Sequence, residues 1–480
     1  MRSQKVKVAR TRTLALALAL AALASLALAS ASFATAPATG AACQASDGKI
    51  SGRGSTFQNN AIAAYIAGYT TDVCGPVANQ YAGDPGGTNM LAYNYPNAAA
   101  GGVGTGSGGG QKAMSCRTDA FGGTDVPYFA ATLTQLNGAA GSISGCDISF
   151  LPPYTPTPNA GGPPFYPHAA DSTANIMSFP VAGGAVGIAV HLAVSGTCPS
   201  PPSSLQFSSL TMSHLFGGDY ATWSAPDLVA DNPSLAGCST PITRIVRSDK
   251  SGTTQTMKNY FKNVDGSRTL CDGVNTWTGL AADANNIVWP SGGTCVGTLT
   301  TASGTPGVVS AVNTTDGGVA YGDLSAWRGD GSVVLANLET HDSTVSGPAV
   351  YVGPGSFTAG SNCNMGAKGL PGSSNADSVG LNASGNNWAA DAGVNVSDIT
   401  FLGTGYPICT LTWDFVYTRL NNGSVANPIS GLTADQRRTL YSFFTYVFSP
   451  AAQSRMAVQG YDPLPTTWLT KLRLGFQAGF

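Results

Sequence analysis

The chain has 480 residues, of which only 10% are charged, and its formal net charge at pH 7 is −2. Proteins that bind nucleic acid usually carry a strongly basic surface, which this composition does not supply. We therefore expect no nucleic-acid partner. The chain is longer than one hydrophobic core usually spans, and at least two lobes are therefore expected.

The N-terminal segment is basic and then strongly apolar. Five Lys and Arg residues up to Arg12 precede an apolar run over residues 13–29, which is the pattern of an export signal. We predict a signal peptide at 1–31, with cleavage after Ala31 or as late as about Ala36, and an uncleaved membrane anchor is the alternative. Cys43 lies well past the apolar run, without a Leu three residues before it, so no lipid anchor is expected. The prediction is an exported protein, periplasmic or extracellular.

All ten cysteines lie downstream of this signal, which predicts an oxidising compartment and five disulfides. Sequence alone leaves the connectivity open, although spacing makes three local pairs reasonable: Cys271 with Cys295, Cys198 with Cys238, and Cys116 with Cys146. No Cys-x-x-Cys pair occurs, and the histidines are scattered at His168, His191, His214 and His341. We therefore expect neither a metal site nor a cofactor.

The segment RSDKSGTT, Arg247 to Thr254, places a guanidinium and a carboxylate before a Ser-Gly-Thr turn at the start of a predicted helix. A helix start offers free backbone N–H groups and the positive end of the helix dipole, while Gly lets the backbone approach an anion closely. Arg247 adds a planar charged group that matches phosphate or carboxylate geometry. Taken alone, such a segment is more often an ordinary capped helix start.

Two similar turns lie upstream. GRGSTF carries Ser55, Thr56 and Phe57 ahead of the helical pattern at residues 58–69. GTGSGGGQKAM carries Ser107 ahead of a short predicted helix, and the turn AFGGTD follows with Asp125. A flexible linker is the alternative for residues 104–110. A P-loop is excluded there because Gln111 separates the last Gly from Lys112.

In order and spacing, these segments resemble the phosphate-binding receptors of bacterial phosphate ABC importers. The resemblance continues through FPVAGGAVGIAV, LTMSHLFGGDYATW, GGVAYGD and YPICTLTW to the tail FFTYVFSPAAQSRMAVQGYDPLP. It implies that the anion is held by Thr56, Phe57, Ser107, Asp125, Arg247, Ser251, Gly252 and Thr253. Ser55 and Asp249 would support them, with Asp249 orienting Arg247.

The resemblance also implies an α/β, two-lobed periplasmic-binding-protein-like fold of type II, with the ligand cleft between the lobes. The chain of such a protein crosses between lobes twice, here near residues 183 and 325. Lobe one would combine 44–183 with 326–480, and lobe two would be 184–325. The implied partners are inorganic phosphate and the permease subunits of an ABC transporter. The resemblance also implies a monomeric receptor that is not an enzyme.

A carboxylate at the site has a physical rationale. Phosphate keeps a proton near neutral pH, and Asp125 could accept a hydrogen bond from that P–OH group. Sulfate has no proton to give and would leave two acceptors facing each other in a dry site. The alternative is that Asp125 simply caps a Gly-rich turn.

Local patterns fit a mixed α/β sheet. The β-branched runs ITRIVR and GVVSAV, residues 242–247 and 307–312, predict strands. The pattern over residues 433–448 predicts a helix that buries Leu440, Phe443, Phe444, Val447 and Phe448 in the core. A Pro-rich loop at 151–172 and a Gly- and Asn-rich stretch at 355–398 make the chain longer than typical receptors.

Three other functions are compatible with these residues. A secreted phosphoesterase could use Ser107 or Ser251 as a nucleophile, but neither a metal cluster nor a general base accompanies them. A scavenger would bind phosphate without coupling to transport. A structural surface protein would fit the low charge and the Gly, Ser and Thr content.

Overall fold

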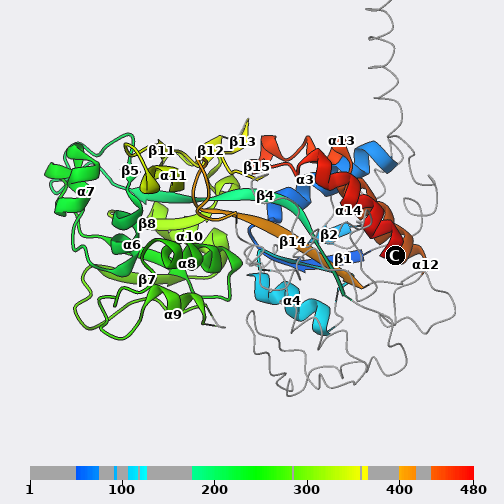
Figure 1. Ribbon diagram of the computed structural model, residues 1–480, viewed down its shortest axis with the longest axis horizontal. Helices are drawn as coiled ribbons and strands as arrows, with labels where there is room; N and C mark the ends of the chain where they lie inside the picture. The colour runs from blue at the N-terminus through cyan, green and yellow to red at the C-terminus, as the bar shows by residue number, and fades with distance from the viewer. Residues whose placement is uncertain are drawn as a thin grey trace, which may run out of the picture. The chain divides into compact units, whose positions relative to one another are not determined.

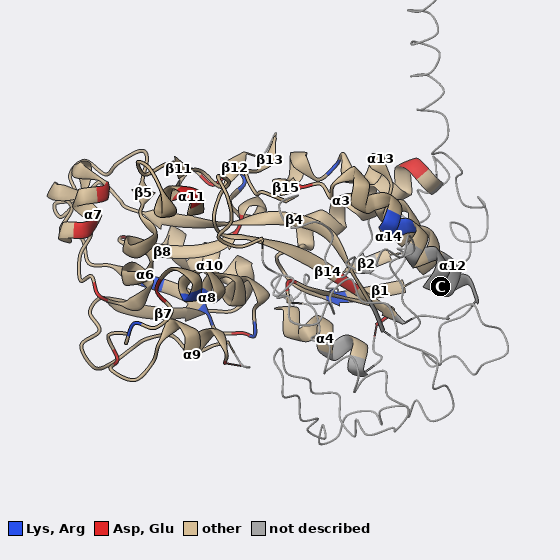
Figure 2. Ribbon diagram, viewed as in Figure 1, with Lys and Arg blue, Asp and Glu red and all other residues tan. Residues whose placement is uncertain are grey.

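The computed structural model describes residues 50–74, 91–93, 106–116, 119–126, 176–283, 286–356, 359–365, 399–417 and 434–479. All of them belong to one compact unit, Ala41–Phe480. The predicted signal peptide, the Pro-rich loop 151–172 and most of the stretch 355–398 lie outside the described residues. Lys, Arg, Asp and Glu colour only scattered parts of the ribbon (Figure 2), in line with the low charge.

A large mixed sheet organises the unit (Figure 1), and its strands follow the order β2-β1-β3-β14-β4-β8-β6-β7. Strand β1 pairs in parallel with β2 and β3, and β6 pairs in parallel with β7 and β8. Strands β14 and β4 are antiparallel to each other and join the two parallel groups. The strands are β1 (Ile50–Gly54), β2 (Leu91–Tyr93), β3 (Phe121–Thr124), β4 (Ile176–His191), β6 (Thr243–Arg247), β7 (Thr298–Ala302), β8 (Gly318–Asp323) and β14 (Cys409–Tyr417).

Strand β4 changes partner half-way along its length. Its first part, Ile176 to Ala185, pairs with β14, and its second part, Val186 to His191, pairs with β8. One continuous strand of 16 residues therefore runs through both groups of strands (Figure 1). The first predicted crossing, near residue 183, falls within it, beside the change of partner.

The second predicted crossing, near residue 325, stays a prediction. Strand β9 (Val334–Leu335), from predicted lobe one, pairs with the second part of β4. Strand β10 (Asn337–Glu339) pairs with β5 (Gln206–Phe207), which lies in predicted lobe two. Residues 334–339 therefore pair with strands of predicted lobe two. The residue bounds of the two lobes stay a prediction.

The run at 307–312 is helical, so the strand predicted there is wrong. It lies in α10 (Gly304–Asn313), where Val308 and Val312 are one helical turn apart and both buried. These two side chains belong to a core cluster with Ile245 of β6 and Ala320 of β8. The helical spacing of the buried valines outweighed the β-propensity of the run.

Helix α12 (Ala434–Val447) confirms the helix predicted at 433–448, and the five apolar side chains expected in the core are all buried. Phe444 packs edge-on against Phe179 of β4, with ring centroids 4.9 Å apart. The other helices are α3 (Asn59–Tyr69), α4 (Gly106–Cys116), α6 (Ser209–Gly217), α7 (Pro226–Asp231), α8 (Gly252–Asp265), α9 (Trp277–Ala281), α11 (His341–Val345), α13 (Pro450–Gln453) and α14 (Thr466–Gly479). The remaining short strands among the described residues are β11 (Tyr351–Val352), β12 (Gly355–Ser356), β13 (Gly360–Ser361) and β15 (Tyr461–Asp462).

Disulfides Cys198–Cys238 and Cys271–Cys295 are present, which confirms two of the predicted local pairs. A further bridge joins Cys363 to Cys409 of β14. The third predicted pair includes Cys146, which lies outside the described residues. Within the described ranges, no helix has the length and apolar character that a membrane crossing requires.

Candidate anion site

The predicted site residues gather at the carboxyl ends of the parallel strands. Ser55 directly follows β1, Asp125 directly follows β3, and Arg247 is the last residue of β6. Helices α3, α8 and α10 begin just after β1, β6 and β7. Ligands of open α/β sheets bind at this edge, where loops and helix N-termini converge. The topology therefore explains how segments far apart in sequence form one site.

Asp125 lies at the centre of the group, with only 1% of its surface exposed. Its Oδ1 accepts hydrogen bonds from Ser55 Oγ at 2.6 Å and from Thr412 Oγ1 at 3.0 Å. Its Oδ2 accepts one from Ser107 Oγ at 3.2 Å. Burial raises the pKa of Asp125 to about 6, against the opposing effect of these hydroxyl donors and of Arg247. The pKa of Asp125 therefore lies closer to neutral pH than that of an exposed aspartate.

Ser107 joins Asp125 to the start of α8. Its hydroxyl oxygen accepts hydrogen bonds from the backbone nitrogens of Asp125 at 3.0 Å and Gly252 at 3.2 Å. Thr253 Oγ1 reaches Asp125 Oδ2 at 3.5 Å, the outer limit of a hydrogen bond. Ser251 caps α8 by accepting the backbone N–H of Thr254 at 3.3 Å. The predicted Ser-Gly-Thr turn is thus a capped helix N-terminus that lies against Asp125.

Helix α4 begins earlier than predicted, within the Gly-rich turn, so Ser107 is its second residue. Small residues permit a close approach of this helix to the sheet: a Cβ atom at Gly110 would lie 2.0 Å from the carbonyl oxygen of Gly123 in β3. Any side chain there would push α4 away from the sheet. The glycines therefore bring Ser107 within hydrogen-bonding distance of Asp125.

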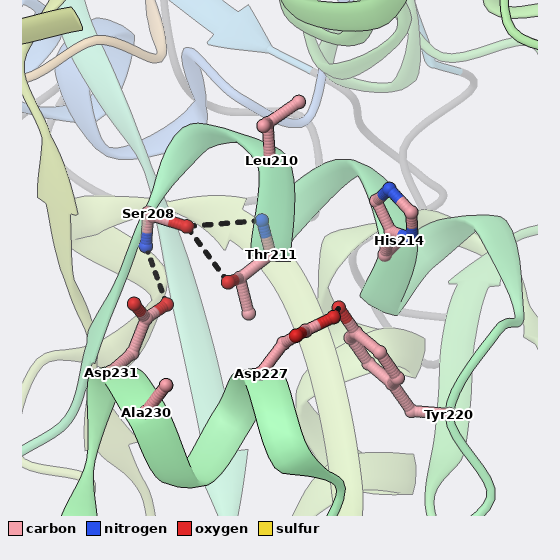
Figure 3. Close-up of a pocket in the computed structure, with 8 residues that line it drawn as sticks. All are labelled: Ser208, Leu210, Thr211, His214, Tyr220, Asp227, Ala230 and Asp231. Atoms are coloured by element: carbon pink, nitrogen blue, oxygen red, sulfur yellow. Dashed lines mark hydrogen bonds between the residues drawn. The ribbon is translucent and has the colours of Figure 1, made fainter.

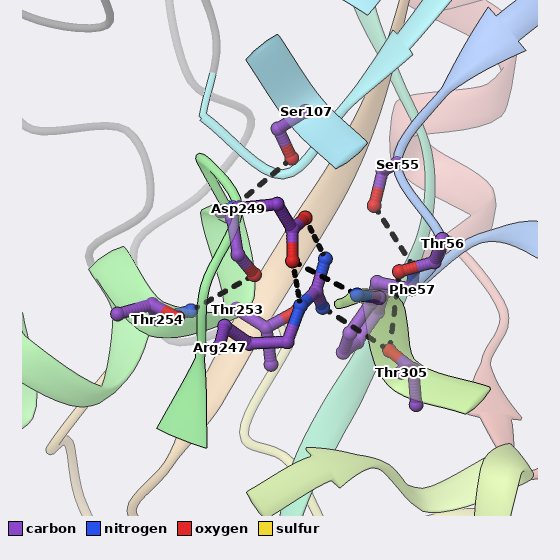
Figure 4. Close-up of polar contacts among 12 residues, drawn as sticks. Ser55, Thr56, Phe57, Ser107, Arg247, Asp249, Thr253, Thr254 and Thr305 are labelled. Carbon is purple, nitrogen blue, oxygen red and sulfur yellow. Dashed lines mark hydrogen bonds and ion pairs between the residues drawn. The ribbon is translucent and has the colours of Figure 1, made fainter. Parts of the chain in front are cut away.

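Arg247 is almost fully buried, at 2% exposure, and pairs side-on with Asp249 (Figure 4). Its Nε donates to Asp249 Oδ1 at 2.7 Å, and its Nη2 donates to Oδ2. Burial lowers the pKa of an arginine, but the hydrogen bonds and charge of Asp249 outweigh it and raise the pKa of Arg247. The same pairing lowers the pKa of Asp249 despite burial. Asp249 therefore holds the guanidinium in one orientation.

The first turn is ordered by its own hydroxyl groups. Ser55 Oγ, besides donating to Asp125, accepts the backbone N–H of Phe57 at 3.0 Å. Thr56 Oγ1 lies 3.1 Å from Thr305 Oγ1, which in turn accepts a hydrogen bond from Arg247 Nη1 at 3.3 Å. The structure thus brings all ten predicted site residues into one connected group.

Two contacting residues, Thr412 of β14 and Thr305 of α10, escaped the sequence analysis. Thr412 donates to Asp125 from 287 positions away, because β14 lies between β3 and β4. Thr412 stands inside YPICTLTW, a segment that carried the resemblance, but nothing local marks its hydroxyl as a site group. Only the tertiary pairing of the strands brings it to Asp125.

A second buried carboxylate lies close by, at the end of β8. Asp323 Oδ2 accepts a hydrogen bond from Ser325 Oγ, and Oδ1 has no hydrogen-bond partner among the described residues. Burial raises the pKa of Asp323 to about 7, and the charge of Asp125 adds to this rise. The hydroxyl of Tyr461 connects Ser325 to the first turn: it lies 2.9 Å from Ser325 Oγ and donates to the carbonyl oxygen of Phe57.

A separate hollow of about 310 Å³ lies between α6 and α7 (Figure 3). Its polar side chains are paired within the protein: Tyr220 donates to Asp227 at 2.7 Å, Asp231 accepts from the backbone of Ser208, and His214 contacts Asp219. We assign no ligand to it. Among the described residues, no group of three or more His, Cys, Asp or Glu could hold a metal ion.

Known proteins resemble this chain in sequence. A family model described as "PBP superfamily domain" matches residues 167–352. The phosphate-binding protein PstS of Xylella fastidiosa (strain Temecula1 / ATCC 700964) is 21% identical over 415 residues, which cover 86% of this chain and 85% of the relative. PstS of strain 9a5c is 24% identical over 260 residues, 54% of this chain, and that match spans 53% of the relative's length.

A solved structure with a similar fold is that of a high affinity periplasmic phosphate-binding protein, PfluDING, bound with phosphate. It is 19% identical, with a TM-score of 0.54, and the match covers 88% of this chain and 93% of that one. This chain is similar in sequence to PstS proteins and in fold to a periplasmic phosphate-binding protein. The likeness confirms the predicted resemblance and the two-lobed α/β periplasmic-binding-protein fold. The relatives are named as binding proteins, not as enzymes.

Proposed function

We propose that this PstS-like chain is an exported receptor that captures inorganic phosphate at the site around Asp125 and Arg247. The observation that carries the proposal is the convergence of three unlike groups: a permanently charged guanidinium, a capped helix N-terminus, and a buried carboxylate held by hydroxyl donors. The first two attract an anion. The carboxylate accepts a hydrogen bond from an anion that still carries a proton.

The proposed ligand set is the one inferred from the sequence: Thr56, Phe57, Ser107, Asp125, Arg247, Ser251, Gly252 and Thr253. Binding would bridge the two predicted lobes, and the closed form would be recognised by the permease subunits of an ABC transporter. The three disulfides of the described residues support an oxidising, extracytoplasmic location. The receptor acts as a monomer in this proposal.

Catalysis is not part of the proposal. A phosphoesterase would need Ser107 free to attack, whereas its oxygen accepts two backbone N–H groups and its hydrogen is directed to Asp125. Hydrolysis of a chromogenic phosphate ester by the purified chain, abolished in Ser107→Ala, would contradict this view.

The deciding experiment is calorimetric titration of the purified mature chain, stripped of bound anion, with phosphate and then with sulfate at neutral pH. One-to-one phosphate binding with no response to sulfate is the expected result. Failure to bind phosphate would move the function to another ligand or to a structural role at the cell surface.

A further inference from the structure

Thr305 is a buried residue of the anion site to which the proposed function gives no role. It is the second residue of α10, and only 3% of it is exposed. The backbone N–H of the preceding Gly304 donates to Asp249 Oδ1 at 2.9 Å. The start of α10 is therefore fixed against the pair that Arg247 forms with Asp249.

The hydroxyl of Thr305 lies between Arg247 and Thr56 (Figure 4). Arg247 Nη1 is 3.3 Å from Thr305 Oγ1, and Thr56 Oγ1 is 3.1 Å from it on the other side. Thr56 and Thr305 are 249 positions apart, and they stand in different predicted lobes. Their contact is thus a direct link across the predicted cleft.

The chemistry of the three groups fixes the direction of the hydrogen bond from Arg247 and permits Thr305 to donate to Thr56. Arginine can only donate, whereas a threonine hydroxyl has one hydrogen and two lone pairs. Thr305 therefore accepts from Arg247, and its own hydrogen is available for Thr56. Once Thr56 accepts that hydrogen, its own hydrogen is left for a third group. In the proposed function, this third group is the bound anion.

We propose that Thr305 is a positioning residue of the phosphate site, which directs the hydroxyl of Thr56 as a donor toward the bound anion and links the two predicted lobes. This inference rests on the proposed function. It assigns a donor series that runs from Arg247 through Thr305 and Thr56 to phosphate. Hydrogen bonds in such a series polarise and strengthen one another.

Thr305 also completes the orientation of Arg247. Asp249 takes the N–H of Nε and one of Nη2, and Thr305 takes one of Nη1. A guanidinium carries five N–H donors. Two donors therefore remain, one on each terminal nitrogen, which suits a bidentate contact with phosphate.

The test compares Thr305→Val, which removes the hydroxyl at nearly constant volume, with Thr305→Ser, which keeps it. Inorganic phosphate is titrated into each variant, and the dissociation rate is measured by stopped flow. We expect Thr305→Val to bind phosphate roughly tenfold more weakly, the loss expected for one hydrogen bond, mainly through faster dissociation. Thr305→Ser should stay within about threefold of the wild type.

The matched control is Thr240→Val. Thr240 is also buried and also shares a hydroxyl contact with another threonine, Thr197, at 2.8 Å, outside the site. It should leave phosphate affinity unchanged. A double variant sharpens the test: if Thr305 acts through Thr56, then adding Thr305→Val to Thr56→Val should cost much less than it costs alone.

The outcomes separate the two proposals. A wild type that fails to bind phosphate overturns the proposed function and this inference together. A wild type that binds while Thr305→Val binds equally well overturns this inference alone, as do full additivity with Thr56→Val and failure of Thr305→Ser to restore affinity. If Thr305→Val does not fold, Thr305→Ala is measured against Thr305→Ser by the same criteria.

Discussion

The hydroxyl oxygen of Ser107 lies 3.2 Å from the backbone nitrogen of Gly252, although 145 positions separate them in the chain. This contact joins the start of α4 to the start of α8. Ser107 also donates a hydrogen bond to Asp125, and Gly252 packs against the Asp125 side chain. A Cβ atom at Gly252 would lie 2.6 Å from Ser107 Oγ. Only a glycine lets the backbone N–H come this close, which explains why the helix start carries one.

We predict that Arg247→Lys weakens phosphate binding roughly 10- to 100-fold, because the charge remains while the paired N–H donors are lost. Calorimetry at neutral pH measures the change. Arg268→Lys is the matched control, since Arg268 forms its ion pairs with Asp219 and Asp265, none of which is a proposed ligand residue. Equal affinities for wild type and Arg247→Lys would show that Arg247 does not donate two N–H groups to the anion.

Asp125→Asn should reduce discrimination between phosphate and sulfate by at least about tenfold, since an amide can donate to sulfate where a carboxylate repels it. The ratio of the two dissociation constants is the quantity to measure. Asp414→Asn serves as control: Asp414 is a buried acidic residue of β14, and its Oδ1 accepts a hydrogen bond from Gln58 at 3.0 Å. An unchanged ratio in Asp125→Asn would mean that Asp125 does not face the ligand.

Acidification should weaken the same discrimination. The pKa of Asp125 is raised to about 6 by burial, so the group accepts hydrogen bonds above that pH and becomes a donor below it. Sulfate does not titrate in this range, and its affinity should rise as the pH falls from 7.5 to 5. Asp323, whose pKa is raised to about 7, also titrates there. Sulfate titrations of Asp323→Asn should keep the rise, whereas those of Asp125→Asn should lose it.

Lys258 of α8 should make stability depend on pH. It is fully buried, donates to the carbonyl oxygen of Asn286 at 2.9 Å, and burial lowers its pKa from 10.5 to about 7. Between these values the unfolded chain binds a proton that the folded chain does not, so this group lets stability rise as the pH increases from 7 to 10.5. Met at this position cannot titrate. The gain in free energy of unfolding of Lys258→Met over wild type should therefore be largest near pH 7 and shrink toward pH 10.

Denaturant unfolding at several pH values measures this difference. Lys262→Met is the control, because Lys262 is an exposed residue of the same helix. A difference between Lys258→Met and wild type that stays constant with pH would argue against a buried, uncharged lysine.

The disulfide Cys363–Cys409 closes a loop with a sequence separation of 46. Replacing both cysteines by serine should lower the free energy of unfolding by ~3–4 kcal/mol, because the unfolded chain regains the freedom of this loop. Thermal unfolding without reductant reports the loss. The bridge Cys271–Cys295, with a separation of 24, should contribute somewhat less. The reverse ranking would contradict a loop-entropy origin.

Much of the candidate site is readable from the sequence because its parts are local. A Ser-Gly-Thr turn before an amphipathic helix specifies its own cap, and an Arg two positions from an Asp can pair within one turn, as Arg247 and Asp249 do. These features need no knowledge of the rest of the fold. The spacing of the aromatic side chains in α12 likewise predicts a core helix without further information.

The remaining features depend on which strands become neighbours. Thr412 contacts Asp125 because β14 inserts between β3 and β4, and Thr305 contacts Arg247 because β6 and β7 pair in parallel. Neither pairing leaves a local signal. Residues 307–312 show the opposite difficulty: the run favours a strand by residue type, and its helical form follows from the surface that Val308 and Val312 cover.

The continuity of β4 has a mechanical consequence for the proposed receptor. The first predicted crossing lies within β4. Strand β4 is hydrogen-bonded to β14 before residue 186 and to β8 from residue 186 onward. A rotation of one predicted lobe against the other would have to bend a hydrogen-bonded strand, because the connection is not a flexible linker. Bending stiffness would then oppose wide opening, and the irregularity in the β14 register at Thr412 and Trp413 would be the compliant point at which curvature concentrates. Thr412, which holds Asp125, sits at that point, so curvature of the sheet and the geometry of the anion site would change together.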